Sequence, residues 1–167
     1  MWAIGCIRTT AEESLAERLS DRGMVVYLPM GQTRIRKARK RCKTTISVPA
    51  FPGYIFIEND SVTDRIYDEP GFYDFIRLEG KRYLLGEDTI SEVRAMEGRN
   101  MFSSDKPGRP RFTIGEVLRV PDGIFGGMVG IVQDISGSDV WLGGRDFSKP
   151  LRLNGLNLLG SDVEYAA

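Results

Sequence analysis

The chain has no histidine and only two cysteines, Cys6 and Cys42, among its 167 residues. The absence of histidine excludes the usual zinc sites and any His-based catalytic triad. The two cysteines are better interpreted as reduced thiols of a cytoplasmic protein than as a disulfide framework. Acidic residues are plentiful, but no pair has a spacing that favours acid-base catalysis. We therefore expect a protein that is not an enzyme and that uses no metal and no cofactor.

The chain also lacks a hydrophobic run long enough to span a bilayer. Its first residues, MWAIGCIRTT, contain neither the basic start nor the long apolar stretch of a signal peptide. The length is sufficient for one ordinary core or two small ones. We expect a monomeric, cytoplasmic protein that does not interact with membranes.

The net charge is zero, but the charges are unevenly distributed. Residues 1–50 carry 10 Lys and Arg against 4 Asp and Glu, residues 51–110 carry 8 against 12, and residues 111–167 carry 5 against 7. A bound polyanion should therefore contact the N-terminal third. Its most basic stretch contains Arg36, Lys37, Arg39, Lys40, Arg41 and Lys43. Such runs are often solvated loops, but six cations in eight residues exceed what the solubility of a neutral protein requires.

Hydrophobic periodicity and turn residues predict an α+β arrangement for the first hundred residues. Thr10 and Glu13 have the spacing of a capping box at the start of a helix, and Ser61 and Asp64 have the same spacing. The expected strands cover residues 2–8, 24–35, 46–58 and 72–78, and the expected helices cover residues 10–23, 59–68 and 87–99.

The C-terminal part of the chain is rich in turn glycines. Residues 112–135, FTIGEVLRVPDGIFGGMVGIVQDI, form a pattern of two strands joined by a tight loop, which suits a small, strongly bent β-barrel. The preceding stretch SSDKPGRP has the composition of a linker. We predict an α+β domain over residues 1–102, a linker over residues 103–110 and a β-barrel over residues 111–167.

Four features resemble the NusG family of transcription elongation and antitermination factors. The barrel segment is similar to the KOW module, with Gly130 as its glycine between two strands, although a generic barrel remains an alternative. The other features are Trp2 in the first strand, Leu28-Pro29 after the second, and FPGYIFI over residues 51–57. The resemblance covers essentially the whole chain. It suits a specialised RfaH-like paralogue, encoded by a phage or plasmid, as readily as a housekeeping factor.

The resemblance implies that the N-terminal domain binds the clamp helices of RNA polymerase and suppresses pausing or termination. Strand alternation places Tyr54 and Phe56 on one face and Ile55 and Ile57 on the other, so only one pair can pack under the domain's own helices. Aromatic residues in strands usually belong to the core, which is the alternative interpretation. Under the family interpretation, we expect an exposed apolar depression that binds polymerase and contains Cys6, Phe51, Pro52, Tyr54 and Phe56.

The same resemblance implies two contacts with nucleic acid. The basic stretch over residues 36–43 would lie near the upstream DNA and contact its backbone independently of sequence. Arg18 and Arg22 are four residues apart and share a helix face, so together with Arg8 they are expected to contact the displaced non-template strand.

The barrel loop is expected to expose Ile124, Phe125 and Met128. Similar loops in the family bind a small-subunit ribosomal protein or the termination factor Rho, so the resemblance implies recruitment of one of these partners. A rival hypothesis is a ribosome-associated KOW protein that binds ribosomal RNA. That hypothesis predicts a basic barrel, whereas residues 111–167 carry two more acidic than basic residues.

Glycine content also bears on whether the C-terminal domain can refold into helices, as in an RfaH-like paralogue. Each interior glycine costs a helix about 1 kcal/mol relative to alanine. Seven glycines would carry this penalty here: Gly123, Gly126, Gly127, Gly130, Gly137, Gly143 and Gly144. We therefore expect a β-barrel in the full-length protein, with the aromatic depression of the N-terminal domain left uncovered.

Overall fold

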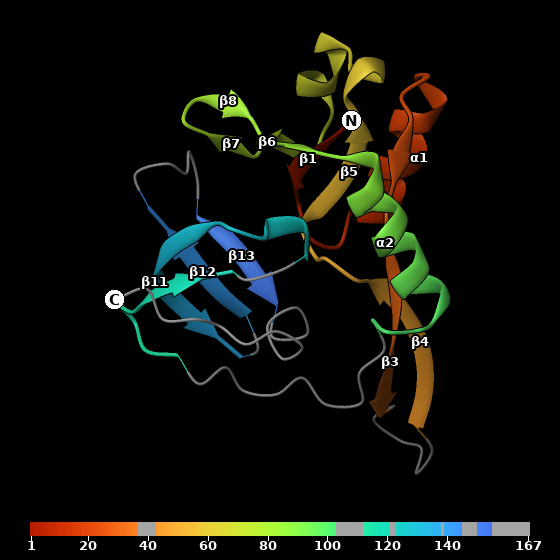
Figure 1. Ribbon diagram of the computed structural model, residues 1–167. Coiled ribbons are helices and arrows are strands. Elements are labelled where there is room, and N and C mark those ends of the chain that lie inside the picture. The colour runs from red at the N-terminus through yellow and green to blue at the C-terminus, as the bar shows by residue number, and fades with distance from the viewer. Residues whose placement is uncertain (37–42, 103–111, 121–122, 138, 145–149, 155–167) are drawn as a thin grey trace.

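The computed structural model describes residues 1–36, 43–102, 112–120, 123–137, 139–144 and 150–154. Figure 1 shows an N-terminal part with helices packed on a sheet and a C-terminal part made of strands. The fold is therefore α+β, as the sequence predicts. Residues 37–42 of the basic stretch and the predicted linker over residues 103–110 lie outside the described residues.

Strand β1 lies at the centre of the N-terminal sheet, whose strand order is β2-β5-β1-β6, with β9 also paired to β1. β1 and β5 are antiparallel, and their register places Ile4 opposite Phe56 and Cys6 opposite Tyr54. The strands are β1 (Trp2–Ile7), β2 (Val26–Tyr27), β5 (Tyr54–Glu58), β6 (Phe72–Phe75) and β9 (Leu84–Leu85).

The two faces of this sheet are covered by different helices. On one face, Ile55 and Ile57 of β5 share a buried cluster with Leu15 and Leu19 of α1 (Glu12–Asp21). The other face carries Phe56, which belongs to a second cluster with residues of α2 (Glu87–Gly98). The predicted alternation along β5 is confirmed, since successive side chains enter opposite clusters.

Hydrogen bonds attach α2 to strands β1 and β2 of the sheet at the two ends of the helix. Near the start of the helix, Trp2 Nε1 donates to Glu87 Oε2 at 2.6 Å. Near its end, Tyr27 Oη donates to Glu97 Oε2 at 2.6 Å. The guanidinium of Arg94 lies between these bonds, 5.3 Å from the ring centroid of Trp2 and 5.0 Å from that of Tyr27.

The predicted capping boxes are wrong. Helix α1 begins after Ala11, which makes no side-chain cap, and Thr10 has a positive φ of 76°. Ser61 accepts a hydrogen bond from the Val25 amide and donates to the Glu58 carbonyl, and the turn that follows has no side-chain cap. Residues 59–68 consequently form two short 3₁₀ turns, η1 (Asn59–Ser61) and η2 (Asp64–Asp68), rather than the expected α-helix.

Two hairpins extend from the N-terminal sheet. The longer one is a ribbon of β3 (Met30–Arg36) and β4 (Lys43–Pro49), which projects away from the body in Figure 1. The shorter one pairs β7 (Arg77–Leu78) with β8 (Lys81–Arg82). Residues 50–53 separate β4 from β5, so the single strand expected over residues 46–58 is two strands in the structure.

The C-terminal part forms a four-stranded antiparallel sheet in the order β10-β11-β12-β13. Its inward side chains include Leu118, Val132 and Leu142, which are almost completely buried. The predicted β-structure of this region is confirmed. Its elements are β10 (Val117–Arg119), η3 (Gly123–Phe125), β11 (Val129–Ser136), β12 (Asp139–Gly143) and β13 (Leu151–Asn154).

Truncation of Phe56 should destabilise the N-terminal part. Its side chain is fully buried, and its ring lies 5.8 Å from that of Phe51 and 6.1 Å from that of Tyr27. Phe56→Ala should lower the free energy of unfolding by about 3–5 kcal/mol. Tyr73→Ala, at a side chain that is 54% exposed, should change it by less than about 1 kcal/mol. Urea denaturation of the two variants tests this difference, and equal effects would contradict it.

Candidate functional site

The predicted aromatic depression is not exposed in this structure. Tyr54 is 5% exposed and Phe51 is 6% exposed, while Cys6 and Pro52 are half-buried. Phe56 lies in the core of the N-terminal part, as described above. The expectation of an uncovered depression is therefore wrong, because the C-terminal sheet and its η3 turn pack against this face.

The contact between the two parts centres on Tyr54. Its ring lies 5.4 Å from the ring of Phe125 in an edge-to-face arrangement. Its Oη accepts a hydrogen bond of 2.6 Å from the backbone N–H of Arg152 in β13. One side chain of β5 therefore makes both an aromatic and a polar contact with the C-terminal sheet.

The barrel loop is buried by the same contact. Phe125 is 3% exposed, and Ile124 and Met128 are similarly buried within the cluster that contains Tyr54. The expectation of exposed apolar side chains at this turn is wrong for the full chain. The two surfaces that the sequence predicts for two different partners cover each other here.

Burial raises the pKa of the Tyr54 hydroxyl above its usual range, and the neighbouring Cys6 adds to this shift. The backbone hydrogen bond from Arg152 opposes the shift only partly. Tyr54 therefore remains protonated at neutral pH. Its Oη can accept the Arg152 bond through a lone pair without the burial of a charge.

Arg152 is held in place by its own side chain. Its Nε donates to Asp139 Oδ2 at 2.9 Å, its Nη2 also pairs with that oxygen, and its guanidinium lies 5.6 Å from the centroid of Trp141. Sequence reasoning missed this residue, because a single arginine at the end of a strand gives no local signal. The pairing of β12 with β13 brings Arg152 beside Asp139 and Trp141.

Phe102 is a second residue that sequence reasoning missed. Its ring lies 5.3 Å from that of Phe51, so it covers the side of the aromatic face where the N-terminal part ends. Gly31 leaves the space for this contact, since a Cβ on Gly31 would lie only 2.3 Å from the carbonyl oxygen of Phe102. A glycine inside a strand pattern was the available signal for a close approach.

The predicted nucleic-acid residues of α1 have another role in the structure. Arg18 Nε lies 3.0 Å from Glu69 Oε2, and Arg22 Nη2 lies 2.5 Å from Glu69 Oε1. The Glu69 carboxylate is almost fully buried, so the two guanidinium groups neutralise a charge that would otherwise be costly to bury. Arg18 and Arg22 therefore stabilise the packing of α1 on the end of η2.

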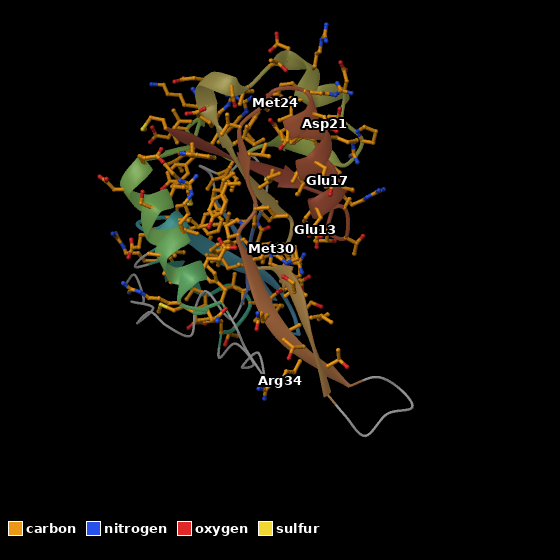
Figure 2. The ribbon with its side chains drawn as sticks, turned by 90° about the vertical axis from the view of Figure 1, so that its right-hand side faces the viewer. Glu13, Glu17, Asp21, Met24, Met30 and Arg34 are labelled. Atoms are coloured by element: carbon orange, nitrogen blue, oxygen red, sulfur yellow. The ribbon has the colours of Figure 1, made fainter. Side chains whose placement is uncertain are left out.

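The outer face of α1 is acidic. Glu13, Glu17 and Asp21 are exposed at four-residue intervals, and Figure 2 shows them along one side of the helix. Such a stripe repels phosphate groups. Arg8 is exposed near the start of the helix, whereas the basic stretch begins in the β3–β4 ribbon, with residues 37–42 outside the described part of the chain.

Comparison with known proteins identifies the family. The family model of NusG, described as transcription termination factor nusG, matches residues 1–94, which is more than half of the chain. The chain belongs to the NusG family. A search of curated proteins found no significant match. The four-stranded C-terminal sheet resembles the small barrel of a KOW module, as the sequence predicts for a NusG-family protein.

Two solved structures are similar along the full chain. One is from a study of domain interaction in Thermotoga maritima NusG, with 19% identity, coverage of 93% of this chain and 94% of that chain, and a TM-score of 0.38. The other belongs to the MjSpt4:Spt5 complex in conformation B, with 16% identity, coverage of 99% and 98%, and a TM-score of 0.32. No helix among the residues described in this NusG-family protein is long and apolar enough to cross a membrane.

The hydroxyl of Tyr54 should protect the amide of Arg152 from exchange with solvent. Tyr54→Phe retains the ring but removes the acceptor, and a typical hydrogen bond contributes about 1 kcal/mol. We expect hydrogen exchange at the Arg152 amide to accelerate roughly fivefold. Tyr27→Phe removes a hydrogen bond from another tyrosine hydroxyl, to Glu97, and should leave the exchange rate of the Arg152 amide unchanged. Equal exchange in the wild type and in Tyr54→Phe would contradict the assigned bond.

Proposed function

We propose that this protein is a transcription elongation and antitermination factor that binds RNA polymerase through the aromatic face of its N-terminal domain. The proposed domain limits are residues 1–102 for the polymerase-binding domain and 111–167 for the KOW domain. The supporting observation is the contact of Tyr54 with Phe125, a ring-to-ring contact between two surfaces that each suit an external partner. Family membership supplies the functional class.

Polymerase and the barrel compete for Tyr54 in this proposal. The ring of Tyr54 cannot pack against Phe125 and against a polymerase helix at the same time. Polymerase therefore binds the fraction of molecules in which the barrel has moved away, and the apparent dissociation constant is the intrinsic one divided by that fraction. Displacement also exposes Ile124, Phe125 and Met128, which then recruit a small-subunit ribosomal protein or Rho.

The basic stretch over residues 36–43 supplies the DNA contact of the proposed complex. We assign this role to the basic stretch and to Arg8 rather than to Arg18 and Arg22, which bind Glu69. Positive charge near the ribbon and the acidic outer face of α1 together favour one orientation of the DNA. The bound protein keeps the polymerase clamp closed and suppresses pausing or termination.

Polymerase binding by matched variants tests the competition. Phe125→Ala weakens the barrel contact but leaves Tyr54 intact, so the apparent affinity of the full chain for RNA polymerase should rise at least about threefold. Tyr54→Ala removes a side chain that both surfaces use, and the affinity should fall even though the barrel is released. Ile131→Ala, at an exposed position of β11, is the control and should behave as wild type.

Three results would overturn the proposal. A fall in affinity with Phe125→Ala would show that the barrel assists polymerase binding rather than competing with it. An unchanged affinity with Tyr54→Ala would remove the aromatic face from the polymerase interface. Binding of ribosomal RNA by the full chain, without binding of polymerase, would favour the ribosome-associated alternative.

Salt dependence tests the DNA contact. Lys37→Gln with Arg39→Gln should lower the slope of log K against log salt for the elongation complex by roughly 0.9 for each DNA phosphate that the variant no longer neutralises. Arg65→Gln with Arg99→Gln removes the same charge from exposed positions outside the ribbon and serves as the control. Equal slopes in the two double variants would indicate a nonspecific charge effect.

A further inference from the structure

The β3–β4 ribbon has two chemically different faces. Its register places Gln32 opposite Ser47 and Arg34 opposite Thr45. Because side chains alternate along a strand, these four residues lie on one face of the ribbon, and all four are exposed. We call this set, Gln32, Arg34, Thr45 and Ser47, the polar ribbon face.

The opposite face of the ribbon is half-buried and mostly β-branched. It carries Thr33 opposite Ile46, and Gly31 opposite Val48. Gly31 at its base is buried against Phe102, which orients this face toward the protein and the polar ribbon face toward solvent. Figure 2 shows Arg34 far along the ribbon from the helices.

Neither strand of the ribbon contains an acidic residue. The sequences are MGQTRIR and KTTISVP, which contain basic residues and no aspartate or glutamate. An anionic partner would meet no repulsion from carboxylates of these two strands. The contrast with the acidic stripe on α1 gives the partner a preferred side of the molecule.

We propose that the polar ribbon face lies in the major groove of duplex DNA and recognises base edges there. The major groove admits a two-stranded β-ribbon. Arginine and glutamine can each bind a purine through two hydrogen bonds, to guanine O6 and N7 or to adenine N6 and N7. Thr45 can donate or accept beside them, and Ser47, whose hydroxyl donates to the Gly31 carbonyl at 3.5 Å, can accept. Seven residues per strand span about 23 Å, enough to enter and follow a groove about 12 Å wide.

This inference rests on the DNA contact of the proposed function and goes further, because it makes that contact depend on sequence. Positive charge is sufficient for binding to phosphate groups, but Gln32, Thr45 and Ser47 are uncharged. Their uncharged hydrogen-bonding groups suit base edges, which present donors and acceptors rather than full charges. Arg34 lies on the same face, opposite Thr45.

The first part of the test identifies a preferred sequence. The full chain is used to select from a pool of 30-base-pair DNA duplexes with a randomised centre. The enriched duplex is then remade with 7-deazaguanine and 7-deazaadenine, which lack the N7 acceptor of the major groove but retain every phosphate. The wild type should bind the remade duplex at least about fivefold more weakly.

Matched variants assign the effect to the polar ribbon face. Gln32→Ala with Arg34→Ala should bind the ordinary and remade duplexes equally, whereas Thr33→Ala, on the opposite face, should retain the wild-type difference. All variants are compared by thermal melting, and unchanged melting temperatures are expected because the two substituted side chains of the double variant are exposed.

Several outcomes would overturn the inference. These are no enrichment from the pool, equal binding of the two duplexes by the wild type, and a deaza effect that persists in the double variant. Preference for duplex RNA or for single strands of the same sequence would also overturn it. Polymerase binding is measured separately: the double variant should retain it, and a wild type that does not bind polymerase would refute the proposed function while leaving the groove inference intact.

Discussion

Strand β5 is apolar on both faces, and this constraint organises the rest of the structure. Ile55 and Ile57 are covered by α1, but α2 occupies only part of the opposite face. Phe56 lies in the part that the N-terminal domain covers itself, beside Tyr27 and Phe51. The ring of Tyr54 reaches the C-terminal sheet instead. A large aromatic side chain exposed to water would lose the free energy that burial of its apolar surface provides. Tyr54 is therefore more stable when another apolar surface packs on it.

The arginines of α1 contribute to the stability of the fold. Arg18 and Arg22 lie on a helix face that looks suitable for nucleic acid, yet they neutralise the buried Glu69. Substitution of either arginine would leave the buried Glu69 carboxylate only partly neutralised, which is unfavourable. In the function proposed above, the cations that contact DNA lie instead in and next to the β3–β4 ribbon, whose two strands contain no acidic residue.

Local patterns in the sequence predict much of the fold but little of the site. Alternation correctly assigns Tyr54 and Ile55 to opposite faces, and the glycines around Gly130 correctly favour strands over helices, because both signals depend on neighbouring residues only. The contact of Tyr54 with Phe125 joins residues far apart in the chain, so no local pattern encodes it. The contacts of Phe102 and Arg152 could not be predicted for the same reason. The capping error at Ser61 has another cause, since its hydroxyl bonds the distant Val25 amide.

In the proposed competition, the chemistry of the Tyr54 contact decides what the protein would lose when the barrel is displaced. A purely apolar contact would be satisfied by any ring or aliphatic side chain, whereas the Tyr54 hydroxyl and the Arg152 amide must each find a new partner when the barrel leaves. Water can form hydrogen bonds with both groups once they are exposed. Displacement of the barrel therefore costs mainly the burial of apolar surface around Phe125. In the function proposed above, a protein partner with a comparable apolar surface would restore that burial. Such a partner would shift the equilibrium only by as much as it binds the uncovered form better than the covered one.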